Sequence, residues 1–147
     1  MVTPQTRRFD ARVEPFSAVL EFIKHFCAGA DVPDRTTEDL ILIVDELSAN
    51  TVRHGYPSAR ERTTEWPIWL NLSVSEREIV VGYEDAAPAH DAFDRIVPPD
   101  YSGPAETWRI GGWGLPLIVR LAYNLRYEHA AGRNRIHFTV PINRPKE

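Results

Sequence analysis

The stretch from Thr36 to Gly55 constrains the fold most, because it predicts one long helix with a buried side. Thr36 or Thr37 is suited to cap its start, and Gly55 followed by Pro57 is suited to end it. Its apolar residues recur at helical spacing and include Ile43, Val44 and Leu47. A helix of this kind must pack its apolar side against another layer of structure.

The remaining apolar patterns predict two further helices and five strands. The expected helices cover residues 16–28 and 115–122, and the expected strands cover residues 7–13, 66–74, 76–85, 124–129 and 135–141. Most of the strands come in pairs joined by short turns, and helices separate the pairs. This order predicts an α+β fold, a two-layer sandwich in which a mainly antiparallel sheet is covered on one face by about three helices.

Length and composition favour a single domain spanning residues 1–147. The formal charge is −4, from 21 acidic and 17 basic residues, and the basic residues are scattered, which argues against a nucleic-acid partner. The one cysteine, Cys27, lies in an apolar helical pattern and excludes a disulfide framework within the chain. The sequence has no cationic leader and no long apolar run, so we expect no membrane partner and a cytoplasmic location.

The predicted helix over residues 36–55 also carries polar residues suited to chemistry. Glu46 and Asn50 are four residues apart, so their side chains project from one face. An amide oxygen suits Mg²⁺, and a neighbouring carboxylate can accept a proton from an attacking hydroxyl. Taken alone, such a pair is most often part of a solvated helix face. Asp45 points about 100° away from Glu46 and is expected to be structural or exposed.

Two further features flank a long stretch that contains four prolines, residues 86–110. Asp85 ends a strand that must be largely buried, where a carboxylate needs a donor such as the exocyclic amine of adenine. Gly111, Gly112 and Gly114 precede a predicted helix, whose N-terminal amides can receive phosphate. A loop as long as 86–110 inside a compact domain usually covers a site. Each feature by itself also fits an ordinary strand end or loop.

Taken in order, these features resemble the GHKL ATPases, a superfamily that includes gyrase, Hsp90, histidine kinases and MutL. The run E-L-S-A-N-T-V-R-H-G-Y-P (46–57) resembles their N-box, Y-E-D-A-A-P-A (83–89) their first glycine box, and G-G-W-G-L-P-L-I (111–118) their second. The short chain, the H-G-Y after the asparagine and the C-terminal L-R-Y-E-H-A-A-G-R-N-R-I look most like anti-sigma-factor serine kinases. The resemblance covers nearly the whole chain.

The resemblance implies that ATP and Mg²⁺ are the ligands and that a protein serine or threonine is phosphorylated. It makes Glu46 the base that activates the partner's hydroxyl, Asn50 the Mg²⁺ ligand and Asp85 the acceptor for the adenine amine. The remaining implied nucleotide-binding residues belong to the two glycine boxes and are Ala87, Ala89, Gly112, Gly114 and Leu115. The loop 86–110 would be the ATP lid. The implied partners are an antagonist protein and a sigma factor, with a possible homodimer.

The first glycine box departs from the Asp-x-Gly-x-Gly pattern of the superfamily, because Ala87 and Ala89 stand where glycines are usual, with Pro88 between them. We therefore expect a different loop path and reduced nucleotide affinity. A second reading stays open, in which the altered box abolishes productive ATP binding and the domain only holds a partner. A histidine-kinase ATPase domain is disfavoured, since no phospho-accepting helix precedes residue 7.

Overall fold

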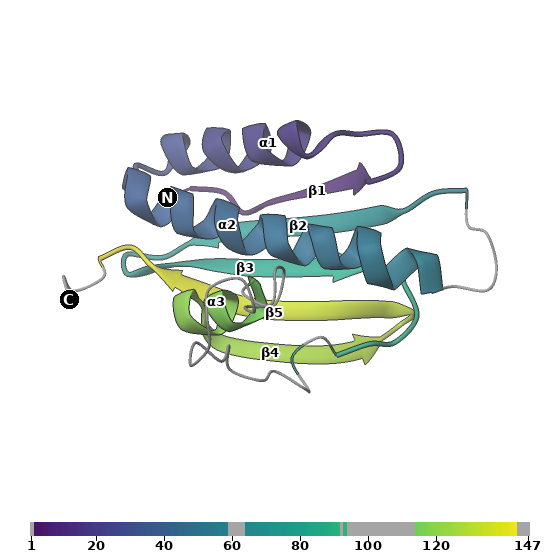
Figure 1. Ribbon diagram of the computed structural model, residues 1–147. Helices are drawn as coiled ribbons and strands as arrows, with labels where there is room; N and C mark the ends of the chain where they lie inside the picture. Colours follow the sequence, from purple (N-terminus) through teal and green to yellow (C-terminus); the bar gives the residue numbers. More distant parts are fainter. Residues whose placement is uncertain (1, 59–63, 92, 94–113, 144–147) are drawn as a thin grey trace, which may run out of the picture.

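The computed structural model describes residues 2–58, 64–91, 93 and 114–143, which form a two-layer α+β sandwich (Figure 1). One layer is an antiparallel sheet in the order β1-β2-β3-β5-β4, and helices α1, α2 and α3 form the other. The strands are β1 (Gln5–Asp10), β2 (Pro67–Val74), β3 (Glu78–Asp85), β4 (Tyr123–Ala130) and β5 (Arg133–Pro141). The helices are α1 (Phe16–Gly29), α2 (Asp34–Asn50) and α3 (Gly114–Leu121). The expected fold class is confirmed.

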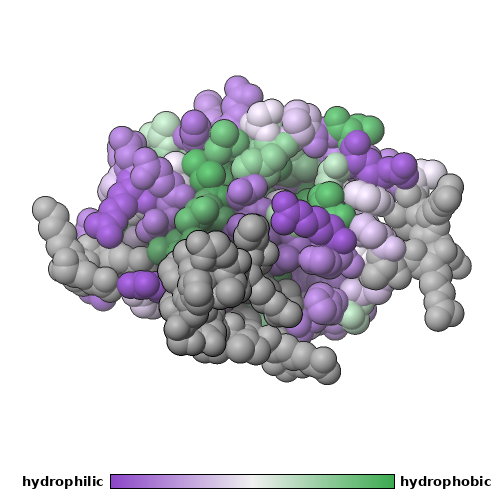
Figure 2. Space-filling view, in the orientation of Figure 1, coloured by the Kyte–Doolittle hydropathy of each residue, from purple (hydrophilic) through white to green (hydrophobic). Residues whose placement is uncertain are grey.

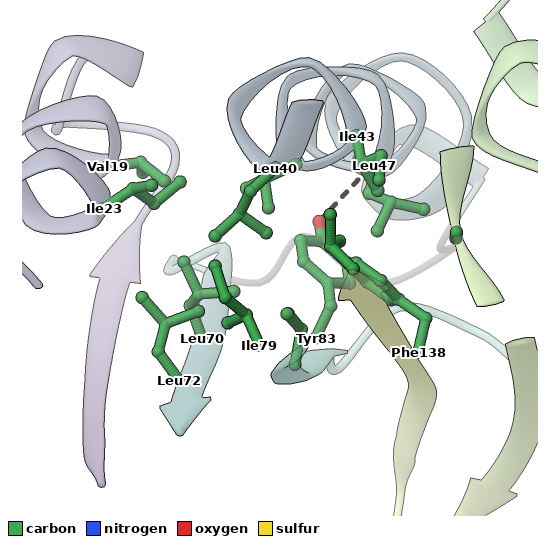
Figure 3. Packing of buried hydrophobic residues seen from close by; sticks show 14 of the residues in the cluster. Val19, Ile23, Leu40, Ile43, Leu47, Leu70, Leu72, Ile79, Tyr83 and Phe138 are labelled. Carbon is green, nitrogen blue, oxygen red and sulfur yellow. Dashed lines mark hydrogen bonds between the residues drawn. The ribbon is translucent and has the colours of Figure 1, made fainter. Parts of the chain in front are cut away.

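The core lies between the two layers, because alternate residues of each central strand point toward the helices. Figure 3 shows strand and helix side chains meeting there. The strands contribute Leu70, Leu72, Ile79, Tyr83 and Phe138, and the helices contribute Val19, Ile23, Leu40, Ile43 and Leu47. All ten side chains are buried, so α2 is held with one face fixed against β3 and β5. The residues at its C-terminal end are thereby placed over the ends of those strands.

Both ends of α2 differ from the sequence-based expectation. The helix begins at Asp34, directly after Pro33, rather than at a threonine cap. Thr36 is instead buried. Its hydroxyl donates a hydrogen bond of 3.0 Å to the carbonyl of Ile142, the residue that follows β5. At the other end, the α-helical geometry of α2 ends at Asn50, and the chain then forms one π-helical turn over Thr51–Gly55.

The turn between β4 and β5 is the two-residue turn expected at Ala131 and Gly132. Both residues lie in the left-handed region, with φ of 53° and 75°. Two successive positive φ angles characterise the type I′ hairpin turn, which favours asparagine followed by glycine. Glycine adopts this geometry freely, whereas Ala131 is strained by roughly 1 kcal/mol.

No helix in the described part of the chain has the length and apolar character needed to cross a membrane. Cys27 is buried on α1, as its apolar neighbours predict. Burial raises the pKa of its thiol, so the thiol is protonated at neutral pH and shielded from reagents.

Candidate functional site

The end of α2, the π-helical turn and the ends of β3 and β5 surround a small hollow with a volume of about 40 Å³. Three of the residues predicted from the sequence, Asn50, Asp85 and Ala87, line it together. The other lining residues are Leu47, Thr51, Gly55, Tyr83, Pro88, His90, Asn134 and Ile136. The fold therefore brings together residues that lie far apart in the sequence, at the place where the N-box and the first glycine box meet.

Asp85 forms the polar centre of this hollow. It is the last residue of β3 and only 7% exposed. Its Oδ2 accepts a hydrogen bond from Thr51 Oγ1 at 2.7 Å, and its Oδ1 accepts from Asn134 Nδ2 at 2.9 Å and from the Ala87 amide at 3.1 Å. A buried carboxylate requires such donors, and here the protein itself supplies three of them.

The hydrogen bonds continue from Thr51 to Tyr83 behind the carboxylate. Thr51 Oγ1 lies 2.6 Å from Tyr83 Oη, and both hydroxyls are within hydrogen-bonding distance of the Leu47 carbonyl. Thr51 has one hydroxyl proton, and the carboxylate of Asp85 is the strongest acceptor within its reach, so Tyr83 donates to Thr51 or to Leu47. Burial raises the pKa of Tyr83 well above its ordinary value, so this donor stays protonated.

Asn134 on β5 is the residue of the site that sequence reasoning missed. Its Nδ2 donates to Asp85 and also lies 3.0 Å from the Ala87 carbonyl and 3.1 Å from the Pro88 carbonyl. Its Oδ1 accepts from the His90 amide at 3.1 Å and from the Tyr127 hydroxyl. A signal existed, since Asn134 shares the inward face of β5 with apolar residues, and an inward-facing amide needs a partner.

The altered first glycine box adopts a path that needs no glycine. Within the described residues 86–91 none has a positive φ, so alanine and proline are accommodated without left-handed backbone. Ala87 is buried against Gly55, where a Cβ added to the glycine would lie 3.0 Å from the Ala87 Cβ. The missing side chain at Gly55 therefore provides the space that the added methyl group of Ala87 occupies. Ala89 is exposed and does not line the hollow.

The tyrosine that follows Gly55 fixes the π-helical turn to the sheet. Tyr56 donates to the Pro67 carbonyl, accepts from the Ala86 amide at 2.9 Å and stacks on Trp66 with ring centroids 5.5 Å apart. Burial is the main cause that raises the pKa of Tyr56 to about 12. The hydroxyl is thus protonated at neutral pH and holds the backbone on either side of the hollow.

Glu46 and Asn50 lie one turn apart on α2 and are both half-buried. The buried Nδ2 of Asn50 has no hydrogen-bond partner in the described part of the chain. Nor does any described residue form a hydrogen bond or ion pair with the Glu46 side chain, which does not line the hollow. Asp45 is exposed, as expected. Unlike Asp85, the side chains of Glu46 and Asn50 are therefore uncommitted, meaning that no described residue forms a hydrogen bond or ion pair with them.

The second glycine box is only partly described. Gly114 begins α3, Leu115 follows it on the same helix, and α3 packs beside α2. Gly112 lies outside the described residues, as does most of the expected lid, of which 86–91 and 93 are described. No group of three or more histidine, cysteine or acidic side chains suited to a metal occurs in the described ranges.

A larger hollow of about 240 Å³ lies elsewhere, between β1, the start of α1 and the second half of α2. Its walls are mostly apolar and include Phe9, Phe16, Val19, Val52 and Ile68. Figure 2 shows that apolar side chains also gather on the surface of the helix-covered face. This hollow contains none of the residues that the sequence assigned to nucleotide binding, so size alone does not identify the site.

Comparison with known proteins identifies the family. Residues 9–140 match the histidine kinase-like ATPase domain, and the chain belongs to this family. No curated protein sequence matches the chain. The predicted membership of the GHKL superfamily is thus confirmed, and the ATPase class of the domain follows from it.

Comparison with solved structures gives one match of similar fold and one weaker match. The RsbU and RsbW domains of Rv1364c from Mycobacterium tuberculosis superpose with a TM-score of 0.64 at 17% identity, covering 97% of this chain. The chain spans 33% of the length of that protein chain. The histidine kinase AdeS of Acinetobacter baumannii gives a TM-score of 0.48 at 16% identity, covering 95% of this chain and 68% of the other. At 17% identity, the likeness to the mycobacterial structure shows a common fold and nothing further.

Proposed function

We propose that this domain is an ATP-dependent protein serine/threonine kinase of the anti-sigma-factor type. The observation that carries the proposal is the pair on α2, where Glu46 and Asn50 remain uncommitted one turn apart, with Asn50 lining the hollow that holds Asp85. If Asn50 were only structural, its buried nitrogen would be expected to have a hydrogen-bond partner within the protein. In a histidine kinase-like ATPase domain, free groups at this position are suited to a ligand.

In this proposal Glu46 is the general base. Its carboxylate would accept the proton of the attacking serine or threonine hydroxyl as the oxygen bonds to phosphorus and the ADP oxygen leaves. Asn50 would hold Mg²⁺ through its amide oxygen, to which no described residue donates a hydrogen bond. Mg²⁺ binds few protein groups and otherwise uses phosphate and water, and when bound it offsets charge on the phosphoryl group.

Asp85 and the glycine boxes would bind the rest of the nucleotide. The Asp85 carboxylate would accept a hydrogen bond from the adenine amine, and Ala87 and Ala89 would lie beside the ring. Gly112, Gly114 and Leu115 would bring backbone amides to the phosphates at the start of α3. The loop 86–110 would close over the site as the lid.

The motifs that resemble those of anti-sigma-factor serine kinases support partners of the anti-sigma kind. We propose an antagonist protein as the phosphoryl acceptor and a sigma factor as a sequestered partner, with a homodimer as the assembly. A cytoplasmic location is part of the same proposal, since such partners act there.

The test is transfer of labelled γ-phosphate from ATP, with Mg²⁺, into proteins of a lysate from the source cells. Glu46→Gln serves as the matched inactive variant. We expect acid-stable phosphoserine or phosphothreonine that depends on Glu46. Acid-labile phosphate would instead indicate a histidine-kinase reaction, and no Glu46-dependent label would contradict the proposal.

A non-catalytic partner-binding domain is the second candidate, and one observation favours it. Asp85 already has three donors from within the protein, and the hollow of about 40 Å³ is far smaller than the roughly 150 Å³ cavity that accepts a benzene ring. In this reading ATP would not bind at millimolar concentration, while the protein would still hold its partner.

A further inference from the structure

The carboxamide of Asn134 has the same kind of donor as the adenine amine. Both are planar NH₂ groups that can donate two hydrogen bonds in one plane. Asn134 presents this group to Oδ1 of Asp85 at 2.9 Å, from the directly opposite position on the neighbouring strand. The carboxylate proposed to recognise adenine is therefore already bound to an internal group of similar chemistry.

Asn134 is also held firmly in this position. The side chain is only 6% exposed, and its oxygen accepts from the His90 amide and the Tyr127 hydroxyl while its nitrogen also reaches the carbonyls of Ala87 and Pro88. These bonds join β5, β4 and the segment 86–90 around one carboxamide. Asn134 thus holds the altered glycine box in place beside the hollow.

We propose that Asn134 is an affinity-determining residue that competes with the adenine amine for Asp85. This inference rests on the proposed ATP binding. The hollow of about 40 Å³ is too small to enclose a purine ring, so we infer that Asn134 and segment 86–90 move when the ring enters. Oδ1 of Asp85 already accepts two hydrogen bonds, so an adenine amine that binds this oxygen exchanges one hydrogen bond for another and gains little net energy.

The exchange predicts a measurable affinity gain when Asn134 is removed. In Asn134→Ala, Asp85 keeps the Thr51 and Ala87 donors, and the adenine amine supplies the third instead of displacing it. The space left by the side chain also enlarges the hollow. We expect ATP affinity to rise roughly ten-fold, which is the weight of one net hydrogen bond.

The experiment is calorimetric titration of the full chain with ATP at saturating Mg²⁺, with four proteins compared. These are the parent, Asn134→Ala, Tyr127→Phe and the control Asn71→Ala, in which an exposed strand asparagine loses its contact with Thr6. Tyr127→Phe keeps the Asp85 contact but removes one of the two donors to the Asn134 oxygen, so it should raise the affinity about three-fold and disturb the fold less than Asn134→Ala. Asn71→Ala should match the parent.

Side-chain amide resonances of Asn134 provide a second readout in the parent protein. We expect them to shift and to exchange faster with water when ATP binds. Unmoved resonances at saturating ATP, or equal or weaker ATP binding by both Asn134→Ala and Tyr127→Phe, would overturn the competition while ATP binding by the parent stands. If none of the four proteins binds ATP, the proposed function itself fails, and the inference fails with it.

Discussion

The two ends of the candidate site are built in opposite ways. At the β3–β5 end, Asp85 is buried and receives hydrogen bonds from Thr51, Asn134 and the Ala87 amide. At the α2 end, Glu46 and Asn50 are half-buried, and the buried nitrogen of Asn50 lacks a partner among the described residues. Polar groups at the first end therefore stabilise the fold, while those at the second are available to a ligand.

The largest expected effect concerns the α2 end. Glu46→Gln should slow phosphoryl transfer roughly 10²–10⁴-fold, because the amide cannot accept the hydroxyl proton. The free energy of unfolding should change by less than about 0.5 kcal/mol, since the side chain has no partner to lose. Rates and urea denaturation measure the two quantities, with the exposed Asp45→Asn as control. Unchanged turnover would rule out Glu46 as the base.

A substitution at the β3–β5 end should lower the stability of the fold. Asp85→Ala leaves the Ala87 amide without its acceptor and removes one acceptor each from the Thr51 hydroxyl and the Asn134 carboxamide. We expect a loss of roughly 2–3 kcal/mol in the free energy of unfolding, from urea denaturation. Asp45→Ala, on the exposed face of α2, should change it little. Equal effects of the two substitutions would remove the contrast between the ends.

The tyrosine behind Asp85 tests the same end through pH. Because the pKa of Tyr83 is raised in the folded state, the unfolded chain loses its phenol proton first as pH rises above about 10. Tyr83 should not change the free energy of unfolding below that pH. Above it, Tyr83 should lower the free energy of unfolding by up to about 1.4 kcal/mol per pH unit. Tyr83→Phe should cost about 1 kcal/mol at pH 7 and make the fall shallower. An unchanged alkaline profile in this variant would contradict the buried phenol.

The smallest expected effect lies outside both ends. Ala131→Asn should stabilise the protein by about 0.5–1 kcal/mol, because asparagine tolerates the left-handed φ of 53° at this turn position. ATP affinity should stay the same, which separates a general stability gain from a change in the site. The neighbouring Ala130→Asn, at the end of β4, is the matched control and should give no gain. Thermal unfolding measures both variants.

The sequence predicted the fold class and most elements because apolar periodicity is a local property of each segment. It also predicted that Asn50, Asp85 and Ala87 belong to one site. It missed the contact between Asp85 and Asn134 because these residues are 49 positions apart and meet only through strand pairing. The expected threonine cap of α2 was wrong for a similar reason, since Thr36 is used in a contact with the end of β5.

For the proposed kinase activity, this histidine kinase-like ATPase domain must bind ATP, and we expect Asp85 to recognise the adenine. Calorimetric titration with ATP and with GTP, each at saturating Mg²⁺, tests it directly. Guanine places a carbonyl where adenine has its amine, so we expect a preference for ATP of roughly ten- to a hundred-fold, which Asp85→Ala abolishes. Equal affinity for the two nucleotides, or no heat of binding at millimolar ATP, would contradict the claim.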